Sequence, residues 1–391
     1  MRLAFAGIVV AVIATACASG GGLPSSFPAV DVSQIRALKI TPASNSACPG
    51  GVVPVQYAAV FTDGTERVFA SRGTTTGGLD PKVLTFASPT ATMGVDGRME
   101  TSADPLASVI KGFPIRVSLV GNPSVSAETT IVPTYECLPR AITAIGGSPT
   151  KVCAAASNGR LSDDHCDLVP RIARGSKEGA VPATNFSVLL GVVRTPFFDS
   201  LLVGVVDVPG DRPIVMLVPA PIKPGILMVT APGRNGTPGM AGRGGELSES
   251  CSSGGSGQNG EDGHPGGDGP TLSLFVQDDN EALQAVVIAR LEGGQGGAGG
   301  PGGQGGAGGV EYNKDPVTGK QSIKCRGTTR GSNGAPGNQG VQGRDGSIAS
   351  GALPLASLFQ QSALWQDPTR RAELSELLEY AARLAKSPPK K

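Results

Sequence analysis

The chain has few aromatic and few charged residues, which excludes several classes of protein. Aromatic residues make up 4% and charged residues 17% of its 391 residues, both low for a globular enzyme with a large core. The net charge of +1 gives no electrostatic footprint for nucleic acid. The only histidines are His165 and His264, too few for an arguable Ser-His-Asp or Cys-His site. We therefore expect a protein that is not an enzyme and that needs no cofactor or metal.

The N-terminal apolar run is too short to span a membrane. LAFAGIVVAVIA follows Arg2 and has the length of a signal-peptide core. The Ala-Thr-Ala sequence before Cys17 resembles the lipobox of bacterial lipoproteins, although Ala14 stands where leucine is usual. The resemblance implies that residues 1–17 are a lipoprotein signal peptide with its anchor, and that Cys17 carries acyl chains such as palmitate. Several chains on one residue would anchor the protein stably.

The lipobox resemblance also implies a location. It places the protein in the bacterial cell envelope, and Ala18 directly after the cysteine favours the outer membrane. A membrane partner, reached through the N-terminal lipid, follows from the same resemblance. An ordinary signal peptidase site in a plain secreted protein is the alternative.

Six cysteines remain after Cys17, an even number that argues for disulfides in an exported chain. They allow fifteen pairings. Proximity in the sequence favours three of them: Cys48–Cys137, Cys153–Cys166 and Cys251–Cys325. None of the cysteines forms a CxxC motif, so zinc and redox sites are not favoured.

Residues 18–34 are interpreted as a linker, and residues 35–137 as a β-sandwich. Apolar residues alternate at Val53, Val55, Tyr57, Ala59 and Phe61, the two-residue period of a half-buried strand. The stretches LKITP, FTDGT and ATMGVDGRM, with a last strand at 126–132, resemble a group 2 bacterial Ig-like domain. This resemblance implies a spacer or adhesion module without catalytic residues.

Residues 138–230 are predicted to form a second, smaller β-rich region. Its strand candidates are 186–194, 201–208, 214–218 and 226–230. The stretch Asp163-Asp164-His165 is interpreted as part of a solvated loop rather than a metal site. The cluster Glu261, Asp262 and Asp268, farther along the chain, does not have the spacing of a calcium loop.

Glycine recurs at every third position in four runs within residues 231–350. Such spacing permits an extended helix with three residues per turn and no internal hydrogen bonds, so its backbone groups need partners elsewhere. Each run is too short and too poor in proline for a collagen trimer. We expect a monomeric chain in which the runs pack side by side, which resembles the polyglycine-II folds of antifreeze proteins and phage tail-tip adhesins. Mixed outward residues such as Arg234 and Met240 disfavour ice binding.

The run at 293–309 differs from the others because it carries glycine in two frames, a frame being a set of positions three residues apart. A frame of glycine lets a neighbour approach closely, so a run with two such frames is predicted to be the inner helix and a run with one to lie at the edge. The residues expected to pack it are Gly293, Gly294, Gly296, Gly297, Gly299, Gly300, Gly302, Gly303, Gly305, Gly306, Gly308 and Gly309. A flexible glycine-rich spacer and a collagen-type trimer are the alternatives.

The segments between the glycine runs are predicted to be β-structure, and the C-terminus a helix. TLSLFVQ and LQAVVIARL are expected to form a small sheet together, and VEYNKDPVTGKQSIKC a hairpin. In residues 351–391, Asp367 is a fitting N-cap with Pro368 at the first helical position. Leucines on one face predict that this short helix docks on its own protein.

These interpretations combine into one expectation. The fold is all-β with a glycine-rich repeat: an Ig-like β-sandwich, a small β-rich region, an intrachain polyglycine-II bundle and a short C-terminal α-helix. The expected function is that of a non-catalytic, lipid-anchored envelope protein, structural or spacer in role. The alternative is a surface adhesin that binds a protein or glycan.

Overall fold

A computed structural model describes residues 30–71, 78–94, 96–143, 150–155, 161–169, 184–248, 251–326 and 329–386. The expected signal peptide, the Cys17 anchor and residues 18–29 of the linker lie outside these residues. The fold is mostly β-sheet with a short C-terminal helix, as expected. In the described part of the chain, no helix combines the length and apolar character needed to cross a membrane.

The chain divides into two compact units, and the division does not follow a single boundary. The first unit takes the chain up to Asn45, then Val52–Thr101 and Phe113–Ile131. The second takes Ser46–Gly51, Ser102–Gly112 and Val132–Lys391. Two short pieces from the first third of the chain are therefore structural parts of the second unit.

The first unit contains two antiparallel arrays of strands. One has the order β1 (Ile35–Pro42), β3 (Val52–Phe61), β7 (Arg98–Thr101) and β6 (Ala91–Met93), with β4 (Glu66–Val68) also on β3. The other has β9 (Asn122–Pro133), β8 (Phe113–Leu119) and β5 (Leu84–Ala87). The predicted alternation on β3 buries Val53, Val55, Tyr57 and Ala59. The ring of Tyr57 lies 5.1 Å from that of Phe86 on β5, so the inner faces of the two arrays share a core.

The second unit is built on two five-stranded sheets. The first has the order β12 (Leu161–Val169), β11 (Thr150–Ala155), β10 (Pro139–Thr143), β16 (Leu227–Thr230) and β18 (Val287–Arg290). The second has the order β15 (Ile214–Pro219), β14 (Leu201–Asp207), β13 (Phe186–Val193), β17 (Thr271–Gln277) and β21 (Ser347–Leu353). Leu227 and Val229 of the first sheet pack with Val188 and Leu272 of the second in one buried cluster.

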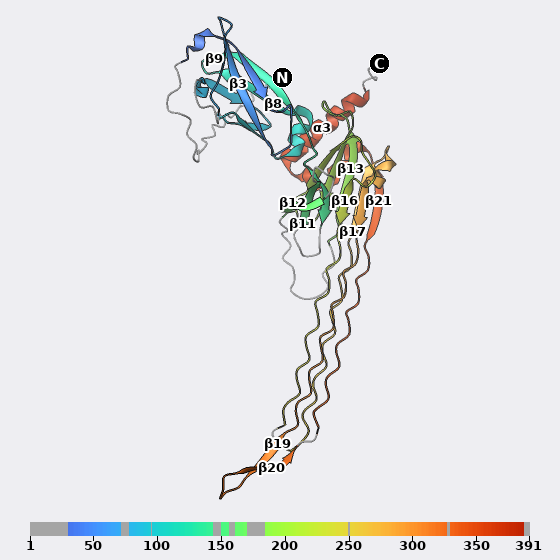
Figure 1. Cartoon of the computed structure of the whole chain (residues 1–391). Helices are drawn as coiled ribbons and strands as arrows, with labels where there is room; N and C mark the ends of the chain where they lie inside the picture. Colours follow the sequence, from blue (N-terminus) through green and yellow to red (C-terminus); the bar gives the residue numbers. More distant parts are fainter. Residues whose placement is uncertain are drawn as a thin grey trace, which may run out of the picture. The chain divides into compact units, whose positions relative to one another are not determined.

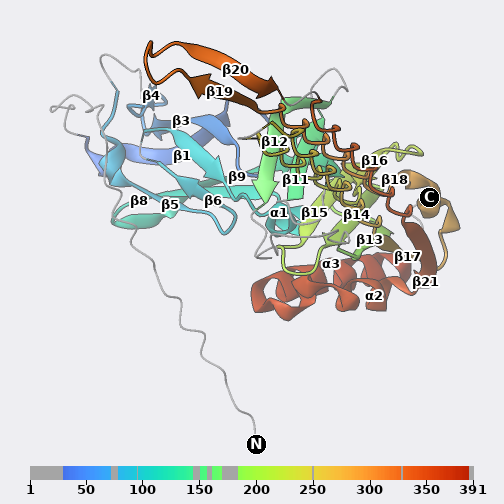
Figure 2. The ribbon, with the colours of Figure 1, turned by 90° about the horizontal axis from the view of Figure 1, so that it is seen from below.

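Helices cover the other face of the second sheet (Figure 2). They are α1 (Pro105–Lys111), α2 (Leu355–Leu358) and α3 (Pro368–Lys386), with the 3-10 turns Phe359–Gln361 and Ala363–Gln366 between the last two. Phe359 and Leu374 are completely buried and pack with Leu217 and Val203 of the sheet. Because this sheet is buried on both faces, its central strands are nearly continuous apolar runs, as in LLVGVV of β14.

Two expectations about the connecting segments need correction. TLSLFVQ and LQAVVIARL do not form a sheet with each other, because β17 pairs with β13 and β21 while β18 pairs with β16. Most of the second segment is also not a strand, since Glu281–Val286 is a 3-10 helix that precedes β18. Burial decides both points: each strand lies where it can add apolar side chains to the core between the two sheets.

The C-terminal helix begins as predicted. The Asp367 carboxylate accepts hydrogen bonds from the backbone N–H groups of Thr369 and Arg370, at 2.8 and 3.2 Å. Leu374 and Leu377 are buried, so the leucine face docks on the protein itself. Helix α3 also contacts α1 through ion pairs, Arg370 with Asp104 and Lys111 with Glu376.

Glu373 on α3 should make stability depend on pH. Burial raises the pKa of its carboxyl group, and the charges of Arg370 and Lys111 offset part of that rise. The folded chain therefore holds this proton more tightly than the unfolded chain does. The resulting stabilisation is present below the ordinary carboxyl pKa and is lost as pH rises through the raised pKa. We expect Glu373→Gln to increase the free energy of unfolding at neutral pH but not at acidic pH, measured by urea unfolding at both. Glu379→Gln, at an exposed position of the same helix, should not show this difference.

Candidate functional site: the four-segment bundle and its hairpin

Four extended segments leave the two sheets and run side by side to a hairpin (Figure 1). We call them segment A (233–246), segment B (254–269), segment C (293–309) and segment D (331–346). Segment A follows β16, segment B leads into β17, segment C follows β18 and segment D leads into β21. The hairpin consists of β19 (Val310–Lys314) and β20 (Gln321–Arg326).

The bundle continues the hydrogen-bond ladders of the sheets. Between β16 and β18 successive residues are paired, from Leu227 with Val287 to Thr230 with Arg290. Beyond the strands, the amide of Ala231 donates to Arg290 and that of Gly233 to Glu292, both at 2.8 Å. From Gly233 onward only every third amide of segment A donates a hydrogen bond to segment C. The strands of the two sheets therefore hold the adjoining ends of the four segments at hydrogen-bonding distance from one another. This arrangement lowers the entropic cost of ordering the glycines.

Backbone hydrogen bonds join the segments in five pairs. Glycine amides of A donate to C, those of C to B, and those of D to C, while B donates to both A and D. Examples are Gly236 to Gln295, Gly297 to His264, Gly340 to Gly297, Glu261 to Met240 and Gly260 to Ala335, at 2.8–2.9 Å. Segments B and C thus each contact three neighbours, whereas A and D each contact two.

The two glycine frames of segment C face two different neighbours. A Cβ built on Gly294, Gly297 or Gly303 would overlap carbonyl oxygens of segment A, and one built on Gly293, Gly299 or Gly305 would overlap those of segment D. Gly296, Gly302, Gly300 and Gly306 follow the same two patterns. Gly309 is buried and its amide donates to Ser252 at 3.2 Å, and Gly308 is half-buried. The third frame of segment C, which includes Ala298 and Ala307, is exposed.

The expectation that a run with one glycine frame lies at the edge fails for segment B. Its continuous glycine frame faces segment C, as a Cβ at Gly260 or Gly263 would overlap carbonyl oxygens there. Segments A and D lie on either side of that direction, while side chains such as Glu261 and His264 are exposed. The number of glycine frames therefore shows on how many sides a segment has no room for a Cβ atom. It does not show how many neighbouring segments there are.

Side chains cap amides that the glycine pattern leaves without partners, and the sequence reasoning missed this role. Asn259, Asp262 and Asp268 of segment B accept hydrogen bonds from the backbone N–H groups of Ala335, Asn338 and Arg344 at 2.8, 2.6 and 2.8 Å. Each donor lies 76 residues beyond its acceptor, which fixes the register of B and D. The available signal was Asn or Asp directly before a glycine at triplet spacing.

This capping predicts a difference between two substitutions at one position. Asp268→Ala should destabilise the bundle by about 1 kcal/mol, because the amide of Arg344 loses its partner. Asp268→Asn should be close to neutral, since an amide oxygen serves equally well at Asn259. Thermal melts followed by circular dichroism would measure both. Equal melting of the two variants would contradict the capping role.

Prolines occur in the segments only where no amide is needed. Pro238, Pro265, Pro301 and Pro336 all lie in exposed positions. In each segment the proline lies in a different frame from the glycines whose amides donate to a neighbouring segment. Since proline has no N–H group and favours extended backbone, these positions stiffen the chain without removing a bond.

The hairpin at the end of the bundle exposes apolar side chains among cations. Tyr312 and Ile323 are cross-strand partners that are 54% and 49% exposed, and Val317 in the turn is 90% exposed. Lys314, Lys320, Lys324 and Arg326 outnumber Glu311 and Asp315 in this hairpin. The Asp315 carboxylate accepts backbone hydrogen bonds from Thr318 and Val317, which hold the pKa of this group below its usual value.

The predicted disulfides Cys48–Cys137 and Cys251–Cys325 are present. The second joins the connection between A and B to β20, with the two Cα atoms 5.6 Å apart. Cys153 and Cys166 are register partners on β11 and β12, but their side chains lie outside the described part. The expectation that Asp163, Asp164 and His165 belong to a loop is wrong, because their backbone is part of strand β12, which pairs with β11; their side chains also lie outside the described part. The lipidation residue Cys17 lies outside it too.

No family model matches the chain, and no curated protein matches it.

Proposed function

We propose that the protein is a non-catalytic component of the bacterial cell envelope, lipid-anchored through Cys17, in which segments A–D form a rigid spacer of polyglycine-II helices. The observation that carries the proposal is the regular lateral hydrogen bonding of backbone amides at triplet spacing, around glycines that are buried or half-buried. At about 3.1 Å per residue, segments of this length would extend for about 40–50 Å. The first unit, with its two facing strand arrays, would be an Ig-like spacer domain.

The spacer proposal predicts a length and a rigidity for segment A, and both can be measured. Spin labels introduced as unnatural amino acids at the exposed positions Arg234 and Leu247 report the span of segment A. A polyglycine-II helix gives a narrow distribution near ~40 Å for 13 residues. A flexible glycine-rich chain gives a broad distribution near ~20 Å, and that result would overturn the spacer.

The anchor is tested separately. A palmitate analogue should label the wild-type protein in growing bacteria and should not label Cys17→Ala. The labelled protein should be recovered in the outer-membrane fraction. Labelling of the Cys17→Ala variant would show that Cys17 is not the lipid anchor, and it would leave the proposal of a rigid spacer unaffected.

The exposed hairpin favours a second candidate, a surface adhesin for a protein or glycan. Tyr312 and Ile323 are paired across the hairpin and exposed, as is Val317 at its turn, and a group of exposed apolar side chains is typical of an interaction site. Deletion of 233–346 is unsuitable as a test because it would remove β17 and β18 from the core. Val317→Asp with Tyr312→Ser should abolish attachment of cells to their target surface if the hairpin is the adhesive part. Val341→Asp, at a valine of segment D that is 76% exposed, is the matched control.

A further inference from the structure

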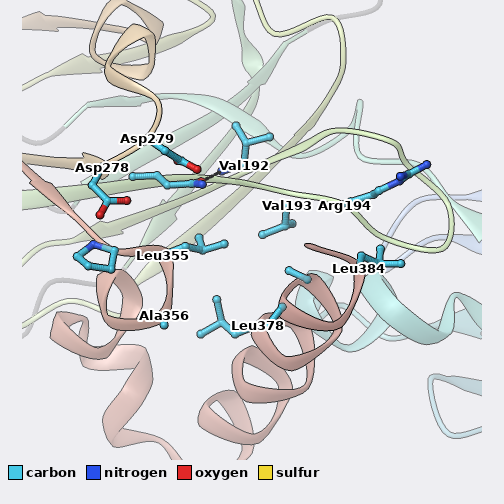
Figure 3. Close-up of a pocket in the computed structure, with 13 residues that line it drawn as sticks. Val192, Val193, Arg194, Asp278, Asp279, Leu355, Ala356, Leu378 and Leu384 are labelled. Atoms are coloured by element: carbon cyan, nitrogen blue, oxygen red, sulfur yellow. Dashed lines mark hydrogen bonds between the residues drawn. The ribbon is translucent and has the colours of Figure 1, made fainter. Parts of the chain in front are cut away.

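An open groove lies at the end of the second sheet that is away from the bundle. It has a volume of about 600 Å³. One wall is formed by the ends of β13 and β17, and the other by α2 and the last turns of α3 (Figure 3). The parallel register of β13 and β17, with Phe186 beside Leu272 and Leu190 beside Val276, places Val192 and Gln277 at this end.

The walls of the groove are mainly apolar. Val192, Leu355, Leu378 and Leu384 line it and are each half-buried, and Val193 beneath them is buried. Leu378 belongs to the same helix face as the buried Leu374 and Leu377. Among the described residues no side chain covers the sheet core where it continues into the groove, and the volume falls within the ~300–1,000 Å³ range of small-molecule sites.

The charges of the groove are asymmetric. Asp278 and Asp279 lie at one end, where β17 finishes, and Arg194 lies toward the other (Figure 3). Arg194 is already paired with Asp199 at 2.8 Å. Among the described residues no cation pairs with Asp278 or Asp279. A molecule bound in the groove would therefore lie beside two carboxylates that no cation in the described part of the chain pairs with, next to apolar walls.

We propose that this groove binds a small amphiphile with one cationic amine and an aliphatic body. The aliphatic part lies against Leu355, Leu378 and Leu384, where it removes exposed apolar surface from water. The ammonium group lies beside Asp278 and Asp279. An anionic amphiphile of the same length would place its charge against the two carboxylates, or would have to compete with Asp199 for Arg194.

The test uses three probes of matched length: decylammonium, decanol and decanoate. In calorimetric titration below the micelle concentration, decylammonium should bind at one site per chain, at least tenfold more tightly than decanoate. The double variant Asp278→Asn/Asp279→Asn should reduce that preference by about tenfold, the effect of two partly exposed ion pairs. Equal binding of the amine and the acid, or an unchanged preference in the variant, would refute the proposal.

A second pair of variants distinguishes the groove from other apolar surfaces. Ala382→Phe fills the groove from an exposed position of α3 and should lower the affinity for decylammonium at least tenfold. Ala372→Phe, also exposed on α3 but outside the groove, should leave the affinity unchanged. If both variants bind the amine as the wild type does, or if no amine binds to the wild type, the groove is not such a site.

Discussion

Valine at Gly297 or Gly303 should disrupt the four-segment bundle, whereas valine at Ala298 or Ala307 should be tolerated. A Cβ at Gly297 would overlap the backbone carbonyl of Thr237, and a Cβ at Gly303 that of Arg243. Both obstacles are backbone atoms, so no side chain can move aside. The third-frame alanines of segment C are exposed, and a larger side chain there extends into solvent.

The expected cost of the glycine substitutions is large. Separating segments A and C breaks the bonds by which Gly236 and Gly239 donate to Gln295 and Ala298, and the clash adds to that loss. We expect a destabilisation of about 3 kcal/mol or more for Gly297→Val, at the upper end of overpacking effects. Ala298→Val should change stability by no more than about 0.5 kcal/mol, as for other surface positions.

Circular dichroism provides the measurement for this pair. The polyproline-II-like signal of the wild type should melt cooperatively, and Gly297→Val should lose this signal at ambient temperature. Ala298→Val should retain both the signal and the melting temperature. If Gly297→Val melted like Ala298→Val, segments A and C would not be in contact, and the packing described above would be wrong.

Loss of the Cys251–Cys325 disulfide should have the second largest effect. The two cysteines are 74 residues apart, so the bond closes a long loop that includes segment B, β17, β18 and segment C. Chain entropy alone would make this bond contribute at most about 4.5 kcal/mol. Replacement of both cysteines by serine should lower the melting temperature of the bundle.

The Cys48–Cys137 bond supplies a matched control for this prediction. It too lies in the second unit, but it joins chain segments outside the bundle. The double variant Cys48→Ser/Cys137→Ser should leave the polyproline-II-like transition where it is, even if the sheets become less stable. A bundle transition that responds equally to both double variants would show that the Cys251–Cys325 bond has no special role in the bundle.

Several local features could be predicted from the sequence because each depends on residues close together in the chain. The two-residue alternation on β3, the hairpin at 310–326 and the N-cap at Asp367 are of this kind. The glycine triplets also indicated extended segments, and the double frame of 293–309 indicated a segment approached from two sides. In all these cases a short-range pattern restricts the backbone directly.

Other features followed from partners that are distant in the sequence. The assignment of β17 and β18 to different sheets and the caps from Asp262 and Asp268 each join residues that are 60 or more positions apart. The backbone hydrogen bonds between segment B and segments C and D join residues that are 27 or more positions apart. No local pattern records such pairings, because they depend on which surfaces can be buried together.

The sequence by itself thus determined where the chain must be extended and where glycine is required, since backbone sterics act within a few residues. Only the tertiary structure decided which segments lie side by side, that Ser102–Gly112 belongs to the second unit, and that a groove stays open beside α3. These outcomes depend on burial of apolar surface and on satisfying backbone hydrogen bonds over the whole chain.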